Sequence, residues 1–168
     1  MDISSIVQTI AVYAIPLIFA ITIHETAHGY VAKLCGDQTA YMLGRLTLNP
    51  IKHIDPVGTI LVPGALLIGS ALTGMSGIVF GWAKPVPINT RYFRKPKRDM
   101  ALTAAAGPAA NLLLGLANAV LFGLFWGLYR AQAYLGLTGM LLTFLLILAD
   151  TFFYAAAINF MFMLFNLI

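Results

Sequence analysis

Charged residues and cysteines are scarce in this chain of 168 residues. Only 10% of the residues are Asp, Glu, Lys or Arg, 60% are hydrophobic, and Cys35 is the single cysteine. A soluble domain has about 25% charged and about 45–50% apolar residues, so this composition excludes an ordinary soluble domain. One cysteine also excludes an internal disulfide. The net charge of +4 does not indicate nucleic-acid binding, because the basic residues cluster in one loop, as in membrane proteins.

A basic n-region of the kind that begins a cleavable signal peptide is missing as well. Asp2 stands near the start, and the apolar run from Ile6 to Val31 is longer than the roughly 7–15 residues of a signal-peptide core. We therefore expect this run to remain as a membrane segment.

Four apolar stretches are each long enough to cross a bilayer core of about 30 Å. They cover residues 6–34, 57–82, 101–129 and 137–168. Pro16 is expected to kink the first. The second is so rich in glycine and proline that a straight helix is disfavoured.

Charge placement predicts the path of the second stretch. The loop from Ala83 to Met100 holds six basic residues against Asp99 alone, so it is expected to be cytoplasmic. The segment from Leu34 to Pro56, with Lys33 at its edge, is expected on the cytoplasmic side as well. Both loops can be cytoplasmic only if 57–82 dips into the membrane and returns, so we expect a re-entrant segment there.

The predicted fold class is therefore an all-α integral membrane protein. It has about three full transmembrane helices and the re-entrant segment, and residues 1–168 form one membrane-embedded domain. The interval Tyr41–Leu48 mixes apolar and polar residues and precedes Asn49-Pro50. It is expected to form a short β element at the cytoplasmic interface.

The motif H-E-x-x-H lies inside the first apolar stretch, at His24, Glu25 and His28. On a helix the histidines are spaced i, i+4, so both imidazoles project from one face and can share a metal ion. Glu25 is then placed to take the proton of a metal-bound water. Zinc is the expected metal, because two imidazoles and a carboxylate are a common catalytic zinc set. The alternative is a structural polar cluster that links helices.

The predicted topology brings other polar residues to the same depth. His24–His28 would lie roughly 9–15 Å from the cytoplasmic end of their helix near Leu34. Gly107, Pro108 and Asn111 would lie equally deep in the third stretch. The fourth stretch would bring Asn159 and Asn166 towards the same side.

Five motifs in order resemble the site-2 protease family of intramembrane zinc metalloproteases, especially its compact bacterial members. They are H24-E-T-A-H28, N49-P-I-K-H-I-D-P-V-G58, G81-W-A-K-P-V-P-I-N89, A106-G-P-A-A-N111 and F165-N-L-I168. The resemblance implies His24 and His28 as zinc ligands and Glu25 as general base. It implies that Asn111 lies near the active site, where it contacts the substrate or the transition state. The alternative role for Asn111, favoured to the same degree, is an interhelical hydrogen bond.

The sequence departs from the family pattern at its end. In the family, F-N-L-I precedes P-x-x-x-x-D-G, whose Asp is the third zinc ligand, and that ligand is expected beyond Ile168. The 168-residue form is therefore expected to be incomplete. Asp55, His53 and Asp150 could substitute, but structural roles are favoured for each. Asp55-Pro56 is typical of a helix cap or turn, and Asp150 lies roughly 24 Å before the F-N-L-I end along a helix.

The predicted function is an intramembrane zinc endopeptidase that hydrolyses peptide bonds of transmembrane helical substrates in regulated intramembrane proteolysis. The alternative is a non-catalytic or truncated membrane protein that binds metal or acts as a scaffold. A transporter is disfavoured, because the paired repeats common in transporters are absent. The expected partners are a transmembrane protein substrate and the lipid bilayer. The expected location is the bacterial inner membrane, multi-pass, with the active site nearer the cytoplasmic face. The sequence carries no signal for an oligomeric state.

Overall fold

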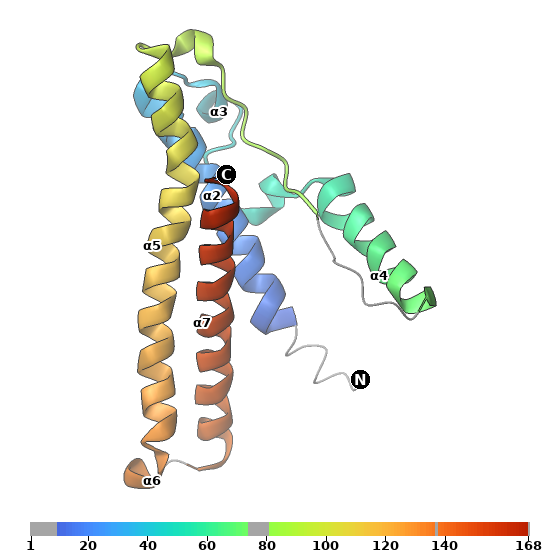
Figure 1. The fold of residues 1–168 in the computed structure, drawn as a ribbon, viewed down its shortest axis with the longest axis vertical. Coiled ribbons are helices and arrows are strands. Elements are labelled where there is room, and N and C mark those ends of the chain that lie inside the picture. Colours follow the sequence, from blue (N-terminus) through green and yellow to red (C-terminus); the bar gives the residue numbers. More distant parts are fainter. Residues whose placement is uncertain (1–9, 74–80, 137, 168) are drawn as a thin grey trace.

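In the computed structural model of this chain, residues 10–73, 81–136 and 138–167 are described. All regular structure in these ranges is helical. Helices α5 (Pro96–Arg130) and α7 (Gly139–Phe165) run antiparallel side by side, and α2 (Ile15–Cys35) packs against both. Figure 1 shows these three helices as a bundle, with α4 (Val62–Thr73) set apart from it.

Two of these helices, α5 and α7, are long and apolar enough to cross a membrane by length and composition. Helix α2 has 21 residues and is not one of the two. It carries the polar motif, and polar residues lower its mean hydropathy. The all-helical fold of the described residues agrees with the sequence prediction, whereas three full crossings stay a prediction.

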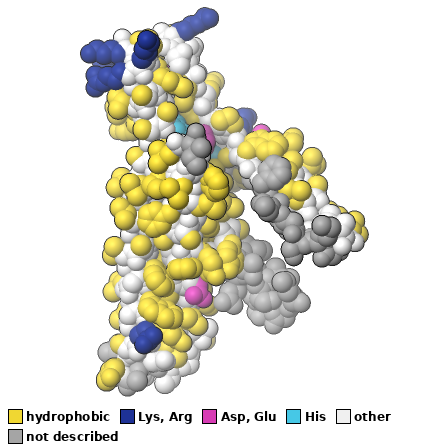
Figure 2. Space-filling view, in the orientation of Figure 1, with side chains coloured by type: hydrophobic (Ala, Val, Ile, Leu, Met, Phe, Trp, Pro, Cys, Tyr) yellow, Lys and Arg dark blue, Asp and Glu magenta, His cyan; other side chains and the backbone are white. Residues whose placement is uncertain are grey.

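The bundle packs through small residues. Gly115 of α5 faces Phe160 of α7 so closely that an added Cβ would lie 2.8 Å from the ring. Ala20 of α2 and Ala149 of α7 are almost completely buried. Most large hydrophobic side chains point outward instead, as the space-filling view shows (Figure 2). Small residues at helix contacts and large apolar residues outside are the arrangement expected for helices in lipid.

The first apolar stretch is helical from Ile10 onward, and its helix is irregular before Pro16. Residues Ile10–Ala14 form a π-helical stretch (η1), and Pro16 lies in the first turn of α2. Proline has no N–H to donate, so it interrupts the regular hydrogen-bond ladder where the π-helical stretch meets α2. The helix ends at Gly36, whose φ of 116° is left-handed, and a Cβ at Gly36 would lie 2.7 Å from the carbonyl oxygen of Tyr92.

The stretch 57–82 begins with a π-helical segment, η3 (Pro56–Leu61), and continues as α4. The Asp55 carboxylate accepts hydrogen bonds from the backbone N–H groups of Val57 and Gly58, so the predicted helix cap is confirmed. Twelve residues of helix span about 18 Å, less than a bilayer core of about 30 Å. The two ends of the stretch meet, because Trp82 N–H donates to the carbonyl of Gly58 at 3.1 Å. Residues 74–80, which belong to the predicted re-entrant path, lie outside the described residues.

The β element predicted near 41–48 is wrong. Thr39–Met42 form a single helical turn (α3), and the residues that follow are irregular. Asp37 initiates the turn, since its carboxylate accepts from both the backbone N–H and the hydroxyl of Thr39. The described part of the chain offers no partner strand, so alternation alone could not produce a sheet. The remaining short helices are η2 (Pro50–His53), η4 (Thr90–Tyr92) and α6 (Gln132–Leu135).

Basic side chains gather at the end of the molecule where α5 begins, which is the top in Figure 2. They come from the loop before α5 and from its first turn, and all are exposed: Arg91, Arg94, Lys95, Lys97 and Arg98. The polar motif of α2 lies between this basic end and the apolar lower part of the bundle.

Candidate metal and catalytic site

The two histidines of the motif face one another on α2. His24 is buried and His28 is half-buried, and their Nε2 atoms lie 3.0 Å apart. Zn–N bonds are about 2.0–2.1 Å, so two nitrogens that share a zinc ion lie no more than about 4.2 Å apart. The observed spacing satisfies this limit.

The opposite ring nitrogens of both histidines are held by oxygen acceptors. His28 Nδ1 donates to the carbonyl of Thr103 at 2.7 Å, and His24 Nδ1 donates to Asn111 Oδ1. The orientation of the Asn111 amide follows from its other end. Its Nδ2 donates to Asn159 Oδ1 at 2.7 Å and to the carbonyl of Ala20 at 3.4 Å.

This arrangement places a proton on the Nδ1 atom of each ring. With hydrogen on each Nδ1, both Nε2 atoms present lone pairs, and these converge at 3.0 Å. Two facing lone pairs repel unless a proton or a cation lies between them. Imidazoles that bind metal commonly donate their other N–H to a carbonyl or carboxylate, as these two do to carbonyl oxygens. The histidines therefore fit a divalent metal such as zinc.

Gly107 of α5 provides the space beside the two rings. A Cβ at this position would lie 2.5 Å from His28 Nε2 and 2.6 Å from His24 Nε2. Only a residue without a side chain lets α5 approach the two Nε2 atoms this closely. Gly107 and Asn111 therefore lie at the level of the two histidines along the bundle, whereas their common depth in a membrane stays a prediction.

Glu25 lies beside a cavity of about 290 Å³. Its Oε2 accepts a hydrogen bond from the backbone N–H of Val86 at 2.8 Å. The cavity is lined by α2, by the segment after Trp82 and by the start of α5: Glu25, His28, Pro85, Val86, Ile88, Met100, Thr103 and Ala104. A carboxylate and an imidazole thus line one cavity that has room for water, and general-base hydrolysis requires such a combination.

No third ligand joins the two histidines in the described ranges, where no group of three His, Cys, Asp or Glu side chains could hold a metal. Asp55 caps η3, and His53 Nε2 bonds to the carbonyl of Thr47. Asp150 lies on α7, 16 residues before Asn166. The Asn166 side chain donates to the carbonyl of Phe162 on its own helix.

The structure adds groups that sequence reasoning missed. Thr103 and Val86 act through backbone atoms, so their side-chain types gave no signal. Asn159 was expected at the right depth, but its bond to Asn111 could not be read from the sequence.

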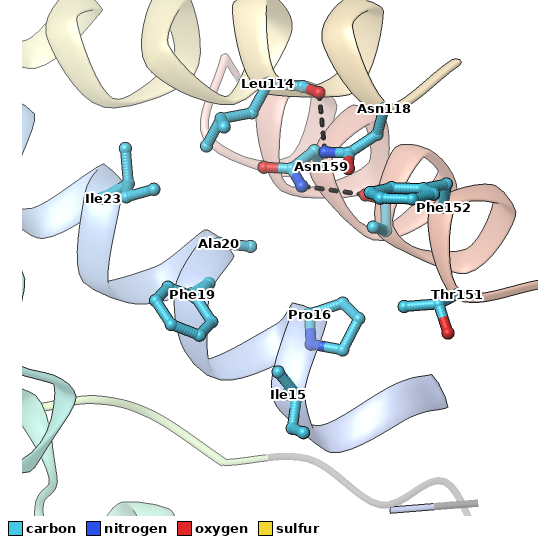
Figure 3. Close-up of a pocket in the computed structure, with 11 residues that line it drawn as sticks. Ile15, Pro16, Phe19, Ala20, Ile23, Leu114, Asn118, Thr151, Phe152 and Asn159 are labelled. Atoms are coloured by element: carbon cyan, nitrogen blue, oxygen red, sulfur yellow. Dashed lines mark hydrogen bonds between the residues drawn. The ribbon is translucent and has the colours of Figure 1, made fainter. Parts of the chain in front are cut away.

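A second cavity, of about 280 Å³, opens between α2, α5 and α7 (Figure 3). Its wall is largely apolar, with Phe19 and Ile23 from α2 and Phe152 from α7. Asn118 and Asn159 each donate to a carbonyl of their own helix, at Leu114 and Ala155. Ala20 and Asn159 line this cleft and also bond to Asn111, so the cleft adjoins the histidine pair.

The chain is similar to two curated bacterial proteins. It is 51% identical over 100 residues to "Putative zinc metalloprotease YwhC" of Bacillus subtilis (strain 168), which covers 60% of this chain and 40% of that protein. It is 28% identical over 109 residues to "Putative zinc metalloprotease Rip2" of Mycolicibacterium smegmatis, which covers 65% of this chain and 39% of that protein. The chain therefore spans about 40% of the length of these relatives. No family model matches the chain, and no solved structure gives a significant match.

Proposed function

We propose that this chain is the core of an intramembrane zinc endopeptidase of the site-2 protease type. The observation that carries the proposal is the histidine pair, whose Nδ1 atoms are both held by oxygen acceptors while their Nε2 atoms face each other at 3.0 Å. The names of the two relatives support zinc and proteolysis. The five ordered motifs support the family.

His24 and His28 would hold the metal, and Asn111 and the Thr103 carbonyl would keep each ring oriented. Bound zinc supplies a Lewis acid that lowers the pKa of a coordinated water to about 7. Glu25, with one oxygen held by the Val86 amide, would accept a proton from the attacking water with its other oxygen. The same carboxylic acid would then protonate the leaving amine nitrogen as the peptide bond breaks.

The proposed substrate is a transmembrane protein helix. The apolar cleft between α2, α5 and α7 adjoins the histidines and suits an apolar segment that arrives from lipid.

The proposed topology places the basic end of α5 in the cytoplasm of a bacterium. The meeting of Gly58 and Trp82 supports a re-entrant path for the stretch between them. The resemblance to the family implies that the third zinc ligand is the Asp of a P-x-x-x-x-D-G motif. Sequencing the reading frame past Ile168 tests whether this motif follows.

The test is Glu25→Gln in the longest reading frame that contains this chain, purified and reconstituted in bilayers with a helical transmembrane substrate. Removing a general base is expected to lower cleavage by about 10²–10⁴-fold. Zinc content should not change, because Glu25 is not a ligand in the proposal. The matched control is Asp150→Asn, the same carboxylate-to-amide change on α7, which should keep both cleavage and zinc.

Full activity in Glu25→Gln would refute the mechanism. Loosely held zinc and no cleavage by the unaltered protein would favour the non-catalytic alternative.

A further inference from the structure

The extended segment Lys84–Asn89, called here the strap, lies beside Glu25. Three of its backbone N–H groups are bound by the rest of the protein. Lys84 donates to the carbonyl of His53 at 2.9 Å, and Val86 donates to Glu25 at 2.8 Å. Asn89 donates to the Asp37 carboxylate at 2.6 Å. The strap is therefore attached at both ends and at its middle.

The prolines of the strap make the Val86 amide distinctive. Pro85 and Pro87 have no N–H, so Val86 supplies the only backbone donor across these three residues. The Val86 side chain also contacts α2, since a Cβ on Gly29 would lie 2.7 Å from Val86 Cγ1. Gly29 follows His28 directly, and its missing side chain lets the strap lie against the motif.

Arg45 binds the carbonyl side of the strap. Its Nη2 donates to the carbonyls of Lys84 at 2.8 Å and Pro85 at 3.3 Å. The side chain is only 9% exposed, and its Nε has no hydrogen-bond partner among the described residues. Burying a cation is costly unless it is hydrogen-bonded, so the two strap carbonyls are what the buried guanidinium binds.

We propose that Arg45 is a positioning residue for Glu25. By holding the carbonyls of Lys84 and Pro85, Arg45 fixes the next amide, that of Val86, on one oxygen of Glu25. The carboxylate then has one defined orientation, and its other oxygen, which has no hydrogen-bond partner among the described residues, is available for proton transfer. This inference rests on the proposed function for its catalytic consequence, whereas the strap geometry stands independently of it.

The first experiment measures hydrogen exchange of the Val86 amide in the reconstituted full-length protein. The variants are Arg45→Gln and Arg45→Lys, and the control is Arg91→Gln, an exposed arginine of the basic end. We expect Arg45→Gln to speed exchange of this amide at least about tenfold, which corresponds to about 1.4 kcal/mol of lost protection. Arg45→Lys should restore part of the protection, because an ammonium can still donate to a carbonyl. Arg91→Gln should leave exchange unchanged.

The second experiment measures cleavage and zinc content in the same proteins. Misplacing a catalytic group by about 1 Å can cost about 10²-fold. We therefore expect kcat to fall about 10–100-fold in Arg45→Gln, with KM and zinc content nearly unchanged and partial recovery in Arg45→Lys. This split separates positioning from loss of substrate or metal binding.

Unchanged Val86 exchange in Arg45→Gln would overturn the inference. The inference would also be overturned if exchange became faster in every helix and zinc were lost in both Arg45 variants, because Arg45 would then stabilise the whole fold. If the unaltered protein binds zinc but cleaves no substrate, the proposed function fails, while the exchange measurement still decides whether Arg45 holds the strap.

Discussion

Replacing Gly107 by alanine should damage the proposed metal site without adding any polar or charged group. The new Cβ would lie 2.5 Å from both His24 Cε1 and His28 Nε2. This is about 1 Å short of the roughly 3.5–4.0 Å at which heavy atoms pack. Both rings are hydrogen-bonded through Nδ1, so they cannot turn away without breaking those bonds.

The expected cost follows from this shortfall. Overpacking a buried contact destabilises a protein by about 1–3 kcal/mol. Disturbing the groups that orient metal ligands typically lowers metal affinity about 10–100-fold, or about 1.4–2.8 kcal/mol. Gly107→Ala should therefore bind zinc about 10–100 times more weakly and lose proteolysis to a similar extent.

The assay is zinc titration against a competing chelator in bilayer-reconstituted protein, together with thermal unfolding. Gly123→Ala is the matched control, because Gly123 lies on the same helix α5 and a Cβ there would meet nothing within 4 Å. Alanine in a helix interior is favoured over glycine by about 0.5–1 kcal/mol, so this control should be neutral or stabilising. Zinc affinity in Gly107→Ala equal to that of the control would refute the proposal that these two rings hold the metal.

Two further predictions concern Asn111 and Asp37. Asn111→Ala removes the hydrogen-bond partner of His24 Nδ1–H and of Asn159 Oδ1. The free energy of unfolding should therefore fall by about 1–3 kcal/mol, and zinc affinity should fall about 10–100-fold. Asn118→Ala is the control in the same titration, and equal zinc affinities in the two variants would contradict the role of Asn111. Burial alone would raise the pKa of Asp37, but hydrogen bonds from Thr39 and from the backbone of Asn89 outweigh it and lower this pKa below its ordinary value of 3.8. Because the unfolded chain then binds the proton more readily, Asp37 stabilises the fold above about pH 4, and this stability is lost as pH falls through the lowered pKa. Asp37→Asn should lower stability at pH 7 by about 1.5–3 kcal/mol, and the gap between variant and unaltered protein in thermal unfolding should close in acid; a gap independent of pH would contradict this account.

Helix geometry explains why much of the site could be predicted. The i, i+4 spacing of His24 and His28 needs only a local helix, and the structure supplies one. The fixed rise per residue also predicted that Asn111 and Asn159 would reach the level of His24, and hydrogen bonds now link all three. The cap at Asp55 is local in the same way.

The β element near 41–48 shows where sequence patterns fail. A strand forms only with a partner, and alternation of side chains cannot supply one. In the structure the Asp37 side chain instead initiates a helical turn at Thr39.

The amino-acid sequence was enough to predict a helical protein and one helix that presents two imidazoles and a carboxylate. These depend on composition and short-range spacing. The packing of the helices was needed to show which ring nitrogens face each other, why Gly107 has no side chain, and how the Val86 amide meets Glu25. Those contacts join distant segments, and several are made by backbone atoms. Almost every residue carries the same backbone groups, so no choice of side chain could have revealed them.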